Sequence, residues 1–93
     1  MNVRWQNQFK KDYKRMIKRG KAINKLDNVI KELAVPNPLP EKYRDHFLMG
    51  NYAGYRECHI EPDWLLIYGY ETLDDEQEQL LLVRTGTHSD LFV

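Results

Sequence analysis

Residues 55–70 are YRECHIEPDWLLIYGY, and this stretch predicts two strands joined by a short turn. The first strand, Tyr55–Ile60, alternates between two faces, as a half-buried strand does. Pro62 makes the turn, and Trp64–Tyr70 is β-forming and nearly all apolar, as expected of a central strand. The alternation places Tyr55, Glu57 and His59 on one face of the first strand, and Arg56, Cys58 and Ile60 on the other.

A further strand is predicted after this pair. Leu73–Gln79 is polar and acidic, which indicates an exposed hairpin loop, and Leu80–Thr85 follows as an apolar strand. Gly86 ends that strand, and Thr87 or Ser89 could cap a final short turn. Alternation predicts that two side chains of the strand, Leu81 and Val83, face opposite to Leu80, Leu82 and Arg84.

The N-terminal half predicts a strand and two helices. Val3–Trp5 is a short apolar start, which predicts a strand. Two segments then carry apolar residues at the spacing of one helix face. Gly20 separates the two helices, and Pro36 ends the second. The apolar positions are Phe9, Tyr13, Met16 and Ile17 in the first helix, and Ile23, Leu26, Val29, Ile30 and Leu33 in the second.

The segment between the second helix and Tyr55 has a weaker pattern. Pro36–Pro40 predicts a stiff extended connector, and Glu41–Gly54 is irregular, with Phe47–Met49 as a short strand or one turn. The chain is then a strand, two helices and a three-stranded meander. We therefore expect one α+β domain over residues 1–93, with two antiparallel helices packed on one face of a small antiparallel sheet.

Composition and charge narrow the cellular compartment and the type of binding partner. No apolar run approaches the ~20 residues of a membrane helix, and the N-terminus lacks the apolar core of a signal peptide. Cys58 is the only cysteine, so no internal disulfide can form, which favours a reducing cytoplasm. Residues 1–44 hold twelve Lys or Arg and four Asp or Glu (+8), and residues 45–93 carry −8. The first half presents either a basic face for an anionic partner or a solvated helix surface.

Three histidines and Asp63 are the candidate chemical groups. His59 ends a strand, His88 follows the last strand just past a glycine, and His46 lies in an expected loop. Because strand ends and loops meet at one edge of a sheet, we expect these groups to form one acid–base site. The strands of His59 and Arg84 both flank the central strand, so they should lie roughly 10 Å apart. A phosphate group with its sugar could span that gap.

These groups fit RNA cleavage through the 2′-hydroxyl. One group removes the 2′-hydroxyl proton, another protonates the departing 5′-oxygen, and a cation stabilises the phosphorane. An imidazole, with an ordinary pKa near ~6.5, can do either proton transfer at neutral pH. Arg84 could bind the phosphate or form a salt bridge with an acid on the facing strand. Trp64 and Phe92 could stack on a base or pack in the core.

A metal site and a cysteine nucleophile are the rival interpretations. Three histidines and Asp63 could ligate zinc, but no pair shows the close spacing of a metal motif, so we expect neither a metal nor a cofactor. Cys58 lies on the face opposite His59, where a small buried side chain is expected. The chain has neither a glycine-rich phosphate loop nor a G-x-S-x-G motif.

Four segments resemble one known family. Residues 43–46 are YRDH, residues 50–56 are GNYAGYR, residues 59–68 are HIEPDWLLIY and residues 84–92 are RTGTHSDLF. Together they strongly resemble the YafQ branch of the RelE superfamily, which are toxins of bacterial type II toxin–antitoxin systems. The resemblance covers essentially the whole chain.

The resemblance implies a RelE-like microbial ribonuclease fold and a metal-independent endoribonuclease that works without a cofactor. Such a toxin cuts messenger RNA in the A site of the 70S ribosome, next to 16S ribosomal RNA. The resemblance also implies a cognate antitoxin, often of the ribbon-helix-helix type. The complex meets operator DNA only through that antitoxin, and no membrane partner is implied.

Specific residues carry over by matching motif. The catalytic residues would be His46, His59, Asp63 and His88, and the substrate-binding residues would be Arg84, Trp64 and Phe92. Among these we expect His88 as the general acid, with Asp63 or His46 on the base side and His59 positioning or stabilising charge. The alternative is a non-catalytic module that keeps the fold and binds an antitoxin or RNA.

Overall fold

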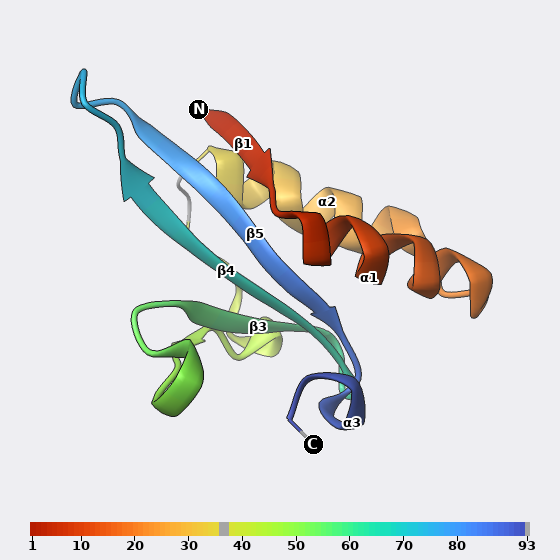
Figure 1. Ribbon diagram of the computed structural model, residues 1–93. Coiled ribbons are helices and arrows are strands. Elements are labelled where there is room, and N and C mark those ends of the chain that lie inside the picture. The colour runs from red at the N-terminus through yellow and green to blue at the C-terminus, as the bar shows by residue number, and fades with distance from the viewer. Residues whose placement is uncertain (36–37, 93) are drawn as a thin grey trace.

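The computed structural model describes residues 1–35 and 38–92, and it shows helices packed against a five-stranded sheet (Figure 1). The strand order is β1-β5-β4-β3-β2. No helix among the described residues has the length and apolarity needed to cross a membrane. The elements are β1 (Asn2–Trp5), α1 (Asn7–Lys18), α2 (Ile23–Ala34), the 3-10 turn η1 (Glu41–Tyr43), β2 (His46–Phe47), the 3-10 turn η2 (Gly50–Tyr52), β3 (Arg56–Glu61), β4 (Trp64–Thr72), β5 (Glu78–Gly86) and α3 (His88–Leu91).

The predicted α+β architecture is confirmed, and the sheet is larger than the predicted meander. β3, β4 and β5 form the expected antiparallel meander. β1 pairs in parallel with β5, and β2 adds a short antiparallel strand to β3, so the sheet is mixed. β2 contains His46, which therefore lies in a strand and not in the predicted loop. Of the predicted connector, Pro36 and Asn37 lie outside the described residues.

β4 contributes to the hydrophobic cluster on each face of the sheet, because its first six residues are all buried and alternate between the two faces. α1 and α2 cover one face, where Trp64, Leu66 and Tyr68 pack against the helices. The other face holds a smaller cluster around Leu65 and Ile67, which α3 helps to close. The helices bury their apolar sides here because residues spaced three or four apart share one face.

A β-bulge changes the direction in which Arg84 points. Tyr68 of β4 pairs with Leu82 of β5, but the next pair is Ile67 with Arg84, so Val83 has no partner of its own. Paired residues share a face, so Arg84 lies on the Ile67 side of the sheet, opposite to Leu82. The prediction that Arg84 faces with Leu82 is wrong, because strict alternation takes no account of the inserted residue.

A buried carboxylate joins α1 to the end of β5. Asp12 is 1% exposed. Because β1 ends at Trp5, the edge of β5 beyond it is open, and Asp12 accepts a hydrogen bond there from the Thr85 backbone N–H at 3.2 Å. The same carboxylate accepts from Arg84 Nε at 2.7 Å and from Arg15 Nη2 at 3.1 Å. α1 is thereby fixed to the strand that carries Arg84.

The acidic hairpin loop lies at the far end of the molecule from α3. It spans residues 73–77 and is shorter than predicted, because β5 already begins at Glu78. Figure 1 shows the loop at one tip of the β4–β5 hairpin and α3 beside the opposite end. The negative charge of this loop is therefore remote from the residues around α3.

We expect Asp12→Ala to lower the free energy of unfolding by about 3 kcal/mol, because Arg84 would lose the partner of a largely buried ion pair. Urea unfolding at pH 7 measures this change. The double variant Asp12→Ala with Arg84→Ala should cost less than the sum of the two single changes.

Asp27→Ala is the matched control for this prediction. Asp27 lies at a partly exposed site and accepts one hydrogen bond, from the Tyr13 hydroxyl at 2.8 Å. Its loss should cost only about 1 kcal/mol. Equal costs for Asp12→Ala and Asp27→Ala would show that the joint between α1 and β5 contributes nothing special.

Candidate active site

Glu57 on β3 holds two of the predicted histidines. The sheet register places His46 of β2 opposite Glu57, and His59 follows Glu57 by two residues on the same face. Glu57 Oε1 lies 3.1 Å from His59 Nε2 and 3.5 Å from His46 Nε2. Glu57 is 5% exposed, so it is a buried acceptor beside two more accessible imidazoles.

Sequence reasoning missed Glu57 as a site residue. Alternation along the strand already placed it on the face of His59, and that was the signal that could have found it. Its contact with His46 depends on the register of a two-residue strand. No sequence period specifies so short a pairing.

The three imidazoles form a row. The ring centroids of His46 and His59 are 6.4 Å apart, and those of His59 and His88 are 5.8 Å apart. The register explains this, since Leu65 of β4 pairs with His59 on one side and with Gly86 on the other. α3 begins with His88 directly after the turn at the end of β5. The fold thus brings together the histidines that the sequence indicated.

Asp63 contacts His88, the histidine at the end of the row opposite His46. Asp63 Oδ1 accepts a hydrogen bond from the His88 backbone N–H at 2.9 Å and lies 2.6 Å from His88 Nδ1. The hydrogen bonds from the backbone and then the side chain of His88 lower the pKa of Asp63. Both side chains are more than half exposed, so substrate can reach this pair.

α3 is anchored by its own cap and by α1. Thr87 Oγ1 accepts from the Asp90 N–H at 3.1 Å, and Asp90 Oδ2 accepts from the Thr87 N–H at 2.9 Å. Arg19 donates to both oxygens of Asp90, at 2.6 and 3.1 Å. The hydrogen bond from Arg19 is the main reason that the pKa of Asp90 lies far below its usual range. Of the two predicted caps, Thr87 is the one used, and it fixes the start of the helix at His88.

Two residues named in the sequence analysis are core residues. Trp64 is 0% exposed, and its indole N–H donates to Thr85 Oγ1 at 3.0 Å. This contradicts the prediction that Trp64 stacks on a base, because a ring sealed beneath the helices offers no face to substrate. Cys58 is fully buried on the face opposite His59, where burial raises the pKa of its thiol. It is the core side chain that the sequence predicted.

Arg84 and Phe92 lie nearer the surface. Arg84 pairs with Asp12 of α1, so it is in a salt bridge, although not with an acid on the facing strand. Its Nη1 also points to the Tyr52 hydroxyl at 3.4 Å, and 19% of its side chain is exposed. Phe92 is 44% exposed and meets the Tyr52 ring edge-on at 5.9 Å. Phe92 can therefore contact a base, while Arg84 is already engaged.

His46, Glu57 and His59 could also hold a metal ion. One ligand atom from each lies within 4.8 Å of the others, and two imidazoles with a carboxylate suit zinc or copper. The sequence spacing does not show this cluster, because it arises from the pairing of β2 with β3. A metal bound there would engage one nitrogen of each imidazole and would therefore compete with acid–base chemistry at these two histidines.

Comparison with known proteins finds relatives along the whole chain. Residues 1–93 match the family described as the bacterial toxin of type II toxin–antitoxin system, YafQ. The chain is 44% identical over 93 residues to the mRNA interferase toxin YafQ of Escherichia coli strain K12, covering 98% of this chain and 95% of that protein. It is similar to the crystal structure of YafQ from E. coli BL21(DE3), with 42% identity, a TM-score of 0.87, and 99% and 98% of the two chains covered. It also matches a chain of the E. coli DinJ–YafQ complex, with 42% identity, a TM-score of 0.80 and the same coverage.

The anchor of α3 makes a prediction about pH. We expect Asp90→Ala to lower the free energy of unfolding at pH 7 by about 1 kcal/mol, the usual worth of a helix cap, because the exposed arginine adds little in water. The folded pKa of Asp90 is lowered, so its contribution is complete above the unfolded value near ~3.9 and is lost as the pH falls below it. Urea unfolding from pH 7 down to pH 2 would follow the difference from the unsubstituted protein.

Ser89→Ala is the control, since Ser89 is an exposed neighbour in the same helix. It should change stability by less than about 0.5 kcal/mol at every pH. A difference for Asp90→Ala that grew toward acid pH would contradict the assigned role of Asp90.

Proposed function

We propose that this chain, which belongs to the YafQ family of toxins of bacterial type II toxin–antitoxin systems, is an endoribonuclease that cuts messenger RNA. The observation that carries the proposal is the row of His46, His59 and His88. Two of its imidazoles are each held by a carboxylate, His59 by Glu57 and His88 by Asp63. Such a pair supplies the base and the acid for attack by the 2′-hydroxyl.

His88 is the general acid in this proposal, and Asp63 orients it. The lowered pKa of Asp63 keeps its carboxylate ionised at neutral pH and makes it a weak base. An ionised carboxylate can only accept hydrogen bonds, so the proton stays on His88 Nδ1. In its imidazolium form His88 carries a second proton on Nε2, and Nε2 gives that proton to the departing 5′-oxygen.

His59 is the better candidate for the general base. Glu57 accepts from His59 Nε2, which leaves Nδ1 to take the 2′-hydroxyl proton. His46 has an oxygen beside each ring nitrogen, the Phe47 carbonyl at 3.0 Å and Glu57 at 3.5 Å. Donation from both nitrogens suits an imidazolium, which would stabilise the phosphorane. The sequence suggested His46 for the base side and His59 for positioning or stabilising charge, so these assignments exchange the two roles.

The ribosomal A site is the setting that we propose for cleavage. The support is the charge of α1, which presents a row of exposed lysines away from the sheet. Such a face can meet phosphates of 16S ribosomal RNA while the histidines meet the messenger RNA, and binding would weaken steeply with salt. The lysines are Lys10, Lys11, Lys14 and Lys18.

A cognate antitoxin completes the proposal. A relative from E. coli was crystallised as the DinJ–YafQ toxin–antitoxin complex, which supports neutralisation by a bound protein. For this chain we infer an antitoxin of the ribbon-helix-helix type, which alone would contact operator DNA. The toxin itself requires neither a metal cofactor nor a membrane for this chemistry.

We expect His88→Ala to slow single-turnover cleavage of a defined messenger RNA on purified 70S ribosomes by roughly 10²–10⁴-fold, the usual worth of one proton transfer. Asp63→Asn should slow it by a smaller factor, because His88 remains but loses the acceptor that fixes its tautomer. Primer extension maps and quantifies the cuts, and a chelator selective for zinc and copper, used at constant magnesium, should leave the rate unchanged.

Asp74→Ala is the matched control, because it removes a carboxylate from the remote hairpin loop. Its rate should equal that of the unsubstituted protein. Rates within a few-fold for His88→Ala and Asp63→Asn would refute the assignment. Absence of cuts from the folded, unsubstituted protein would instead favour the non-catalytic binding module. Inhibition by the chelator for zinc and copper at constant magnesium would favour metal chemistry at His46, Glu57 and His59.

A further inference from the structure

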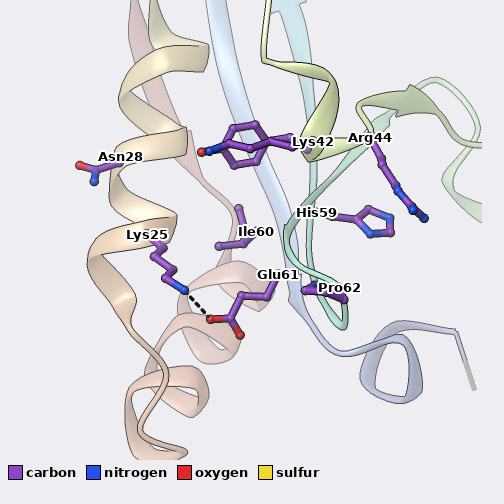
Figure 2. A pocket seen from close by; sticks show the side chains of 9 residues that line it. Lys25, Asn28, Lys42, Arg44, His59, Ile60, Glu61 and Pro62 are labelled. Carbon is purple, nitrogen blue, oxygen red and sulfur yellow. Dashed lines mark hydrogen bonds and ion pairs between the residues drawn. The ribbon is translucent and has the colours of Figure 1, made fainter.

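A cleft of about 460 Å³ opens next to the histidine row. Its walls come from α2, from η1 with the residue that follows it, and from the end of β3 (Figure 2). His59 lines this cleft as well as the row, so a strand of RNA placed at His59 would lie at the mouth of the cleft. The cleft is separate from Arg84, which does not line it.

The charge of the cleft is positive. Three cationic side chains line it, Lys25, Lys42 and Arg44, against one carboxylate, Glu61. Glu61 is already paired with Lys25 at 3.0 Å and with Lys21 at 3.4 Å, and these contacts lower its pKa, Lys25 most. Within residues 1–35 and 38–92, the ion pairs include neither Lys42 nor Arg44. Both cations therefore lack a carboxylate partner and can take an anionic ligand, and Lys42 Nζ lies over the Tyr43 ring at 5.2 Å from its centroid.

Arg44 is held in an unusual backbone conformation. Its φ of 48° and ψ of 46° are left-handed, where a β-carbon is disfavoured and glycine or asparagine is the usual choice. Figure 2 shows its side chain directed toward His59 at one edge of the cleft. A backbone strained in this way is often found at functional sites, so the guanidinium of Arg44 is a candidate for contact with a ligand.

The chemistry of the proposed reaction supplies the ligand. RNA cleavage needs cations beside the phosphates, and Arg84, the predicted one, has its Nε on Asp12 at 2.7 Å. Arginine binds phosphate oxygens in a bidentate fashion, and lysine binds them as a point charge. Among the described residues that line the cleft together with His59, Lys42 and Arg44 are the cations that form no ion pair.

We propose that the cleft is a binding site for backbone phosphate of the RNA strand next to the cut, with Arg44 and Lys42 as its ligands. This inference rests on the proposed ribonuclease function, because RNA is the substrate that places phosphate at His59. It assigns to Arg44 the phosphate-binding task that the sequence suggested for Arg84.

The test is binding of a single-stranded RNA oligonucleotide that carries 2′-O-methyl groups throughout and so cannot be cut. Arg44→Asn and Lys42→Gln should each weaken binding by about five- to tenfold and reduce the slope of log affinity against log salt by about 0.7, the value for one phosphate contact of a single strand. Asparagine tolerates left-handed backbone, so Arg44→Asn should unfold at a temperature no lower than the unsubstituted protein does.

Neutral methylphosphonate linkages, introduced one at a time, locate the contact. One linkage should weaken binding to the unsubstituted protein and have little further effect on Arg44→Asn. Arg4→Gln is the matched control, because it removes one positive charge from an exposed site on β1 that does not line the cleft. It should change affinity by less than twofold.

Three results would overturn the site. The first is an equal effect of Arg4→Gln and Arg44→Asn, which would mean that only overall charge matters. The second is failure of the unsubstituted protein to bind the oligonucleotide even at low salt. The third is unchanged RNA affinity of Arg44→Asn with weakened antitoxin binding, which would assign the cleft to an acidic peptide.

Failure of the nuclease proposal would look different. Binding that depends on Arg44 in a protein that makes no cuts on ribosomes would support the cleft and contradict the nuclease. Ribosomal cleavage that is lost in His88→Ala but unchanged in Arg44→Asn and Lys42→Gln would support the nuclease and overturn the cleft.

Discussion

The buried carboxylate of Asp12 is the contact on which the active end of the molecule depends. β1 ends too early to pair with the last residues of β5, so the open edge there needs another acceptor, and α1 supplies it. Through Arg84 the same carboxylate fixes the bulged end of β5, and through Arg15 it lies beside Asp90, the residue that caps α3. An unpaired carboxylate at 1% exposure would be costly, so the partners of Asp12 are held together.

The contact between Asp12 and the end of β5 helps to explain how a small fold holds His88 at the start of a four-residue helix. α3 is too short to be stable alone, and its position comes from the capping box and from the ion pair with Arg19, the residue that follows α1. The N-terminal helix therefore supports the C-terminal histidine across the whole length of the sequence. Arg84 is paired with Asp12 in this contact, which is why the phosphate ligands of the proposed ribonuclease site are sought in the cleft.

Much of this arrangement could be predicted from the sequence because it depends on local periods. The apolar spacing of the helices and the alternation of Tyr55–Ile60 predict the faces of those elements correctly. The exception on α1 is Ile17, which continues the apolar stripe yet is 51% exposed. The gathering of His59 and His88 follows from strand order, since both neighbours of Leu65 are fixed once the meander is known.

The rest depends on contacts between distant segments, which no period encodes. Asp12 looks like a surface acid among lysines until the end of β5 is placed against it, and the bulge at Val83 reverses Arg84 without any turn residue to signal it.

The row of histidines has a cation beside its middle residue, His59, and an aromatic ring after its last residue, His88, and this asymmetry has a consequence for recognition in the proposed function. Arg44 lies at the His59 side, in the cleft, while Phe92 follows His88 by four residues and packs on Tyr52. Phosphate contacts fix the register of a strand without reading its sequence, whereas contacts to bases discriminate among them. A strand lying along the row would therefore gain affinity from the cleft and base preference from the exposed ring of Phe92. The two properties are carried by different elements, η1 with its following residue and α3, so one can change while the other is kept.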